Sequence, residues 1–457
     1  MTTEDKEHLS ARLVSNNLAK LRLLTKEVLP EELAEIINEN KDIDANKVFQ
    51  VLEPEKAIRT FENLDFKIQN SLLSSFTIEQ LSSTLNKISP DDRTALFERL
   101  PEEKLRKFLS ILSDEERKVA QSLLKYPENS IGRLMTPDFV SVKEEWTVQQ
   151  VLDYIRQHGK NSETLNLVYV TDHDGFLIDD IRVREFLLAP LDKKVSELMD
   201  RQYFFLNAKD DQEKAVNVFK QSNRNALPVT DFNGLLIGII TVDDVIDVME
   251  EEDTEDIQKF GGTAALDEPY LNISLNKLIR KRAGWLVILF FGEMLTATAM
   301  SYFEDEISKA IVLVLFIPLI ISSGGNSGSQ AATLIVRAMA LGEVTLDLWW
   351  KVIRREIVAG FFLGLILGII GFIRIVAWNS FTNIYGEHWL ALAITVSVSL
   401  TCVVMWGTFS GSVMPMVMKR LGFDPAASSA PFVATLVDVT GLVIYFSVAM
   451  VAMKGVM

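Results

Sequence analysis

The pattern of hydrophobic and polar positions divides the chain into a charged part and an apolar part. Residues 284–457 are mostly apolar, with charges confined to short connections, whereas residues 1–283 carry most of the charge. An apolar helix of ~20 residues is long enough to cross ~30 Å of hydrocarbon. The apolar part therefore predicts five membrane spans. They lie at residues 284–303, 308–333, 356–378, 389–417 and 431–453.

Short helical patterns recur between residues 28 and 118 with a period of roughly 12 residues. Each begins with a turn or an acidic pair and continues with apolar residues at helical spacing, as in "LPEEL" at residue 29 and "LPEEKL" at residue 100. Proline at the first helical position and acids in the first turn are signals for a helix start. We predict an α-helical superhelix over residues 1–130, with an ordinary helical bundle as the alternative.

Residues 131–250 contain one pattern twice. Each copy predicts a strand and a helix, followed by two apolar strands. The steps Asp174-Gly175 and Asn233-Gly234 lie between the paired strands and predict hairpin turns, because glycine accepts the positive φ that such turns need. We therefore expect an α+β repeat. Its two copies span residues 131–194 and 195–250.

This repeat resembles a tandem pair of CBS modules, which sense ligands and do not catalyse reactions. The stretch "GIITVDD" (238–244) matches the nucleotide-contacting pattern of that family, with the hydroxyl residue Thr241 three positions before Asp244. The first copy departs from the pattern, because Arg182 stands in place of the hydroxyl residue. The resemblance implies ATP or another adenine nucleotide as a ligand at Thr241 and Asp244.

The connection after the repeat is strongly acidic, since residues 243–268 hold eleven acids and one base, Lys259. Such a run is usually a solvated helix face. Like charges at helical spacing repel each other by about a few tenths of a kcal/mol per pair, and a hard divalent cation such as Mg²⁺ would relieve that repulsion. The linker (251–283) then ends in an amphipathic connecting helix (272–285) that leads into the first span. The acids that share one helix face are Asp244, Asp247, Glu251, Glu255 and Asp256.

Polar residues interrupt the apolar pattern at the second span. The stretch "ISSGGNSGSQAATLIVRAMALGE" (321–343) follows an apolar run with no charged spacer. Unpartnered polar groups in hydrocarbon are costly, so such groups face protein or water. Close helix packing explains the glycines. It does not explain Asn326 and Gln330, which favour the lining of a wet path.

Two acids lie inside predicted spans. Asp438 stands about two turns into the last span, where an acid costs at least ~2.5 kcal/mol and marks a functional position unless it is protonated or hydrogen-bonded for a structural reason. Near Thr440 and Gly441 we expect a break in this helix that exposes backbone carbonyls. Glu293 in the first span has three interpretations: it lines the path, bonds to a neighbouring hydroxyl group, or couples a proton.

The distribution of basic residues predicts the orientation of the spans. Lys and Arg cluster at 280–282, 337–355 and 419–420, whereas the connections at 304–308 and 379–388 have acids and little base. By the positive-inside rule, the large N-terminal part lies in the cytoplasm and the C-terminus lies outside. We expect a homodimer in which two sets of five spans share one path.

Composition argues against several functions. A net charge of −16 disfavours a nucleic-acid partner and attracts metal cations. One Cys and four His argue against a disulfide framework and a zinc cluster. The N-terminal residues have no apolar stretch of the kind that a signal peptide needs. We find no phosphate-binding loop, zinc-protease motif or Ser-His pair, and we expect no enzyme.

The stretches "GGNSGSQAATLIVRAMALGE" and "PFVATLVDVTGL" resemble the two membrane signatures of the MgtE family of bacterial magnesium channels. The order of the parts is similar over essentially the whole chain. The resemblance implies a homodimer in the bacterial cytoplasmic membrane, with Mg²⁺ passing along the two-fold axis and cytoplasmic Mg²⁺ closing the path. The pore residues that it implies are Asp438, Asn326, Ala434 and Gly325. The regulatory residues that it implies are Asp211, Glu213, Asp244, Asp247, Glu251, Glu255, Asp256 and Asp424.

The chain departs from the family pattern in three places. Asn223 stands where the family can have an acid, and Glu79, Gln80 and Ser83 replace a more acidic edge, so we expect a weaker or shifted response to Mg²⁺. Glu293 is an additional membrane carboxylate. The alternative function is a secondary transporter of divalent cations that is coupled to H⁺ or Na⁺ through the two membrane acids and regulated by nucleotide at the CBS pair.

Overall fold

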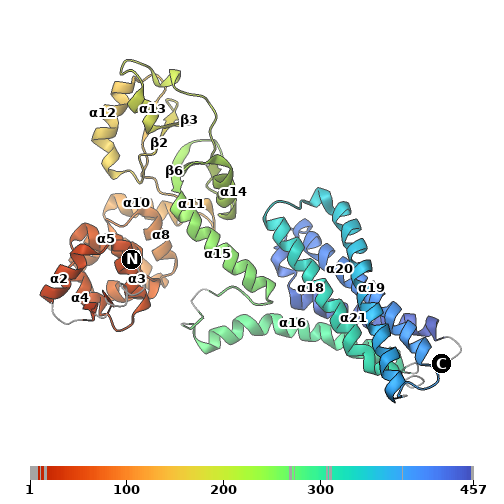
Figure 1. Ribbon diagram of the computed structural model, residues 1–457. Helices are drawn as coiled ribbons and strands as arrows, with labels where there is room; N and C mark the ends of the chain where they lie inside the picture. The colour runs from red at the N-terminus through yellow and green to blue at the C-terminus, as the bar shows by residue number, and fades with distance from the viewer. Residues whose placement is uncertain are drawn as a thin grey trace. The chain divides into compact units, whose positions relative to one another are not determined.

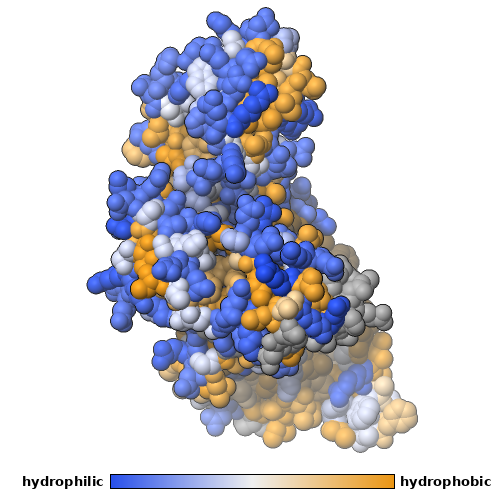
Figure 2. All heavy atoms as spheres, turned by 90° about the vertical axis from the view of Figure 1, so that its left-hand side faces the viewer, coloured by the Kyte–Doolittle hydropathy of each residue, from blue (hydrophilic) through white to orange (hydrophobic). Residues whose placement is uncertain are grey.

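The computed structural model describes residues 9–10, 12–14, 18–266, 270–271, 273–304, 307, 311–382 and 384–453. The chain forms two compact units, Met1–Glu250 and Glu251–Met457, and each is considered by itself (Figure 1). Hydrophilic side chains cover most of the face of unit Met1–Glu250 that Figure 2 presents.

Short helices make up the first part of unit Met1–Glu250. Proline occupies the start of α3, α5 and α8, as the repeated sequence signals predict. Successive helices pack against the helix two places further along the chain, which is the stacked arrangement of a superhelix around one apolar core. The helices are α2 (Leu18–Glu27), α3 (Pro30–Glu39), α4 (Ala45–Phe49), α5 (Pro54–Glu62), α6 (Phe66–Ser75), α7 (Ile78–Leu85), α8 (Pro90–Glu98), α9 (Glu102–Ile111), α10 (Asp114–Leu123) and α11 (Ile131–Leu134).

The two copies of the α+β repeat fold alike. In each, a parallel strand pair is extended by an antiparallel hairpin, with sheet orders β1-β2-β3 and β4-β5-β6. Both hairpin turns are confirmed, with φ of 93° at Gly175 and 94° at Gly234. The first copy contains β1 (Ser141–Lys143), α12 (Val148–His158), η1 (Gly159–Asn161), β2 (Leu167–Thr171), β3 (Leu177–Arg182) and α13 (Val183–Leu188). The second contains η2 (Val195–Glu197), β4 (Leu206–Asn207), α14 (Glu213–Ser222), β5 (Ala226–Thr230), β6 (Leu236–Thr241) and the start of α15 (Val242–Phe260).

Among its described residues, unit Glu251–Met457 has five helices that are long and apolar enough to cross a membrane, as predicted. The amphipathic helix expected at 272–285 is not a separate element, because it continues into the first span as one helix, α16. The elements are α16 (Leu275–Tyr302), η3 (Ile311–Phe316), α18 (Ile317–Ala340), η4 (Leu346–Leu348), α19 (Trp349–Thr382), α20 (Trp389–Arg420), η5 (Pro425–Ala427) and α21 (Ala430–Ala452).

Glycines let α18 and α20 touch through their backbones. A Cβ on Gly411 would lie 2.0 Å from the carbonyl oxygen of Gly328, and one on Gly407 would lie 2.3 Å from that of Gly324. No side chain fits at either position, as is typical of helices that pack closely inside a bilayer. The packing interpretation of the glycine-rich stretch is therefore correct for this face of α18.

The helix break expected near Thr440 is wrong. Helix α21 runs without interruption from Ala430 to Ala452. The Thr440 hydroxyl donates a hydrogen bond to the carbonyl oxygen of Leu436 (2.7 Å) and accepts one from Trp406 Nε1 (2.7 Å). Because the polar side chain is satisfied in these ways, the backbone has no reason to open.

Candidate functional site

The structure brings three of the four predicted pore residues together. Gly325 on α18 faces α21, so that a Cβ at this position would lie 3.5 Å from the Ala434 Cβ and 3.8 Å from Asp438 Oδ1. Ala434 and Asp438 are one helical turn apart and share a face of α21. Among the described residues of this chain, the Asp438 carboxylate has no ion pair or hydrogen bond. The absence of a Gly325 side chain leaves room beside that carboxylate.

Asn326, the fourth predicted pore residue, lies on a different face of α18. Ser322, Asn326 and Gln330 follow each other at intervals of one turn, and all three side chains are exposed in the single chain. Asn326 Nδ2 is 3.5 Å from the Ser322 hydroxyl. The intervening serines are instead used for packing, since Ser327 donates to the carbonyl oxygen of Val404 (3.0 Å). Helix α18 therefore has one packed face and one polar face that its own chain leaves uncovered.

Glu293 belongs to the same region of the membrane unit. The preceding residue, Gly292, packs so closely against α21 that a Cβ on it would lie 2.9 Å from Thr435 Cγ2. The Glu293 side chain is exposed in the single chain. Helix α16, which carries Glu293, therefore packs against α21, the helix that carries Asp438.

The regulatory acids predicted in unit Met1–Glu250 begin helices. Asp211 Oδ1 accepts a hydrogen bond from the backbone N–H of Glu213 (2.9 Å) at the start of α14. Asp244 Oδ2 accepts one from the Thr241 hydroxyl (2.7 Å) at the start of α15. Burial and the nearby Asp91 raise the pKa of Asp244 to about 8, and burial also raises the pKa of Asp247. Thr241 and Asp244 are thus engaged with each other.

Asp91 is the centre of an acidic cluster that the sequence did not predict. Its side chain is buried, and its Oδ1 atom has no hydrogen-bond partner among the described residues. Burial raises its pKa, and the charge of Asp243 adds to the effect. This acidic cluster draws carboxylates from α5, α8, the loops around β1 and β2, and the start of α15. Its members are Glu62, Asp91, Asp92, Asp138, Glu163, Asp243 and Asp244.

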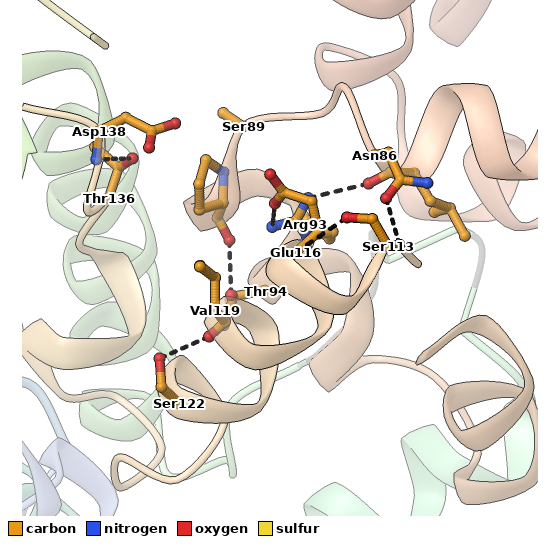
Figure 3. A network of polar contacts seen from close by, with 12 residues as sticks. Asn86, Ser89, Arg93, Thr94, Ser113, Glu116, Val119, Ser122, Thr136 and Asp138 are labelled. Carbon is orange, nitrogen blue, oxygen red and sulfur yellow. Dashed lines mark hydrogen bonds and ion pairs between the residues drawn. The ribbon is translucent and has the colours of Figure 1, made fainter. Parts of the chain in front are cut away.

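Burial and mutual repulsion raise the pKa of several carboxyls of the acidic cluster toward neutral pH. They raise the pKa of Glu62, Asp92 and Glu163 to about 7 and that of Asp138 to about 6. The fully buried Arg93 lies beside the cluster, where it pairs with Glu116 and donates to the carbonyl oxygen of Leu85 (3.1 Å; Figure 3). In the part of the chain that the structure describes, no three His, Cys, Asp or Glu side chains converge closely enough to hold a metal ion.

Two regulatory acids of unit Glu251–Met457 already share a cation. Lys259 Nζ lies 2.5 Å from Glu255 Oε1 and 2.8 Å from Asp424 Oδ2. Burial lowers the pKa of Lys259, but the hydrogen bonds and charges of the two carboxylates outweigh burial and raise it overall. On the same helix, Asp256 is half-buried and Glu251 is exposed. The structure therefore joins Glu255 to Asp424 through a lysine, a pairing that the sequence did not indicate.

A cavity of about 390 Å³ lies between the two copies of the α+β repeat. Arg182, Arg184 and Arg224 give it three cationic side chains, and Asn166, Asn223 and Asn225 supply amides. Thr241 and Asp244, the residues predicted to contact nucleotide, are not among its lining residues. A wall of arginines suits a phosphate-bearing ligand. In the sequence, Arg182 is a departure from the nucleotide-contacting pattern. In the structure, its positive charge lines the cavity, and this charge is the sequence feature that could have indicated a site for an anion.

Family models match most of the chain. The model described as "Divalent cation transporter" (MgtE) matches residues 317–448, the MgtE intracellular N domain matches residues 29–129, and the CBS domain matches residues 131–191 and 195–251.

Relatives and solved structures agree with these matches. The magnesium transporter MgtE of Thermus thermophilus is 33% identical over 460 residues, covering 98% of both chains. That of Enterococcus faecalis is 32% identical over 340 residues, 74% of this chain and 73% of the relative. The cytosolic domain of the Mg²⁺ channel MgtE in complex with ATP has a TM-score of 0.50 and 28% identity, covering 52% of this chain and 99% of that one. The soluble part of a magnesium transporter has a TM-score of 0.50 and 25% identity, covering 55% of this chain and 99% of that one.

Five membrane-spanning helices joined to a superhelical domain and a CBS pair define a multi-pass membrane protein of the divalent-cation transporter class. The chain belongs to the MgtE family of magnesium transporters. The predicted family is therefore confirmed. Its members are transporters and not enzymes, and the comparisons do not favour the H⁺- or Na⁺-coupled alternative.

The acidic cluster predicts that unit Met1–Glu250 loses stability as pH rises. The unfolded chain releases these protons near pH ~4, whereas the folded unit holds them until about pH 6 to 8. This contribution to the free energy of unfolding is therefore fully present below pH ~4 and is lost as pH rises through that range, by up to about 1.4 kcal/mol per pH unit for each proton. Limited proteolysis of the full-length protein in metal-free buffer at pH 6, 7 and 8 measures the loss.

Mg²⁺ should flatten this pH dependence, because a hydrated divalent cation beside the carboxylates offsets the negative charge that appears when the protons leave. The variant Asp91→Asn should show a shallower slope in metal-free buffer. Proteolysis rates that stay constant from pH 6 to 8, or that fall with pH, would contradict the proposed repulsion in the acidic cluster.

Proposed function

We propose that two copies of this chain form a Mg²⁺-permeable channel in the bacterial cytoplasmic membrane, with Asp438 of each copy beside a shared path. The observation that carries the proposal is the uncovered polar region of one protomer, where Asp438 lies next to Gly325 and where Asn326 and Gln330 are exposed. Such groups are too costly to face lipid. A second copy and a water-filled path between the copies would give them suitable surroundings.

The chemistry of this region suits a hydrated magnesium ion. Mg²⁺ keeps several of its waters and binds through one or two carboxylates. Two Asp438 side chains would attract the ion without removing its water shell, and Gly325 leaves the width for that shell. The Asn326 amides and the carbonyl oxygen of Ala434 would bond to the waters, and selection would follow from charge and diameter. Glu293 would add a second carboxylate near the same place.

We propose that cytoplasmic Mg²⁺ closes the path. The N-terminus and the CBS pair would lie in the cytoplasm and the C-terminus outside, as the positive-inside rule indicates. The boundaries that we propose are 1–130 for the N domain, 131–250 for the CBS pair, 251–283 for the linker and connecting helix, and 284–457 for the membrane domain. Mg²⁺ would bind the acidic cluster and the acids of α15 more tightly in the compact form and shift the population toward it. The regulatory residues would be Asp211, Glu213, Asp244, Asp247, Glu251, Glu255, Asp256 and Asp424.

We further propose that the arginine-lined cavity of the CBS pair takes an adenine nucleotide. A related cytosolic domain has been solved in complex with ATP. The three arginines would pair with phosphate oxygens, and the cavity volume suits a ligand of that size. This places the nucleotide beside Arg182 of the first copy, and not at Thr241 and Asp244 of the second.

The pore proposal predicts that Asp438→Asn reduces Mg²⁺ uptake to background while the protein still inserts and dimerises. The amide keeps the shape of the side chain but removes the charge that attracts the ion. Uptake into proteoliposomes, measured with a Mg²⁺-sensitive dye, tests the prediction, and size-exclusion chromatography checks assembly. Glu304→Gln, which removes a carboxylate from the end of a span, is the matched control. Near-normal uptake by Asp438→Asn would remove this residue from the path.

The cavity proposal predicts that Arg182→Ala weakens ATP binding by about tenfold, the loss expected for about 1.4 kcal/mol of charge-assisted hydrogen bonding. Isothermal titration calorimetry of the full-length protein measures it. Arg156→Ala is the control, because Arg156 is exposed on α12 and pairs with Asp153 away from the cavity. If Thr241→Ala weakens binding and Arg182→Ala does not, the nucleotide binds the second copy.

A further inference from the structure

Lys259 is the cation that two proposed metal ligands share. Its ammonium bonds to Glu255 one turn before it on α15 and to Asp424 in the connection between α20 and α21. The three side chains are about one-third exposed, so the pairs are partly shielded from water. The other oxygen of Asp424 accepts a hydrogen bond from the backbone N–H of Ala426 (2.8 Å), which holds the carboxylate in place. We refer to this arrangement as the Lys259 bridge.

Further contacts hold the end of α15 in the same unit. Gly262 has a φ of 75°, and a Cβ on it would lie 2.7 Å from Trp285 Cδ1, so the chain reverses closely against α16. Trp285 Nε1 donates to the Ser429 hydroxyl (2.9 Å) at the start of α21. Lys281 Nζ donates to the carbonyl oxygen of Ala265 (2.6 Å). Each of these contacts forms within the protein itself and uses no metal ion.

A divalent ion and the Lys259 ammonium compete for the same oxygens. Mg²⁺ binds carboxylate oxygens at about 2.0–2.1 Å, or through its waters at a longer distance, and two positive charges this close would repel. The lysine is already within hydrogen-bond distance of both carboxylates. The oxygens of Glu255 and Asp424 can therefore bind a metal ion only if the Lys259 side chain moves away from them.

We propose that Lys259 is a built-in counter-ion that fixes the end of α15 to the 421–429 connection without Mg²⁺, and that a divalent ion binds Glu255 and Asp424 only by displacing it. The proposal rests on the regulatory role proposed above and deepens it. The response of this chain to Mg²⁺ then originates mainly in the acids of unit Met1–Glu250, because the Glu255 and Asp424 carboxylates of unit Glu251–Met457 already share a positive counter-charge.

Amide hydrogen exchange of residues 253–266 tests the proposal in the full-length protein in nanodiscs. The wild-type segment should exchange at the same slow rate with EDTA and with millimolar MgCl₂. Lys259→Met should exchange about tenfold faster or more in EDTA, because two unpaired carboxylates then repel, and MgCl₂ should restore the slow rate. Lys259→Arg should behave like the wild type. Lys419→Met is the control, since it removes a cationic charge from the end of α20.

Four outcomes would overturn the proposal. Slow exchange of Lys259→Met in EDTA would show that the ammonium does not hold the segment. Strong slowing of the wild-type segment by MgCl₂ would show that Mg²⁺, and not the lysine, makes the contact. If MgCl₂ fails to slow hydrogen exchange in Lys259→Met, Mg²⁺ does not take the place of the lysine. If MgCl₂ still slows exchange after Glu255→Gln and Asp424→Asn are added to Lys259→Met, Mg²⁺ does not bind at these two carboxylates. Hydrogen exchange reports the stability of residues 253–266 and does not depend on Mg²⁺ transport. A failure of this proposal can therefore be distinguished from a failure of the pore proposal in the Asp438→Asn uptake test.

Discussion

Carboxylates that are held close together away from bulk water set the main electrostatic constraint on this chain. Charges in such places need a proton or a cation, since their repulsion is weakly screened there. Around Asp91, burial retains protons at neutral pH. Between Glu255 and Asp424, a lysine supplies the charge. At Asp438 and Glu293 we propose that the transported ion supplies the positive charge. The need for a positive charge beside the carboxylates is thus met by a proton, by a lysine and by a metal ion. These three cations imply different responses to Mg²⁺ and pH.

Backbone contact between membrane helices decides where the polar residues of α18 lie. Lipid gives helices little hydrophobic reason to associate, so close packing of small residues has to hold them together. Gly324 and Gly328 lie against Gly407 and Gly411 at distances that leave no room for side chains. This contact fixes the rotation of α18 about its axis. The Gly325 face is then directed toward α21, and the face that carries Asn326 is left uncovered by its own chain.

Local signals in the sequence were sufficient to predict the helices, hairpin turns and membrane spans, but not the clusters of residues that form the candidate sites. Prolines at helix starts, glycines in hairpins and apolar runs of sufficient length act within a few residues, and the structure follows them. The acidic cluster assembles from segments between Glu62 and Asp244, and the Lys259 bridge joins residues 165 positions apart, so no spacing could have indicated either. The expected break near Thr440 was wrong because a local signal was given too much weight. Thr440 suggested a disrupted helix in the sequence, but a tertiary hydrogen bond from Trp406 satisfies its hydroxyl group.

At one pair of equivalent positions the two CBS copies carry opposite charge, because Arg184 of the first copy corresponds to Asp243 of the second, and the helices that contain these two residues differ in length. Strand β3 ends at Arg182, and the short helix α13 that follows it has six residues and contains Arg184. After β6 it has Asp243 and Asp244 and the 19-residue helix α15, which ends beside Lys259. Under the proposed regulation, a cation held at the second copy would act directly on α15. An anion held at the first copy would act on α15 through contacts between the copies, such as the ion pair between Arg224 and the buried Asp180 (2.6 Å). The same fold, used twice, would then provide a direct input for a cation and an indirect one for a phosphate.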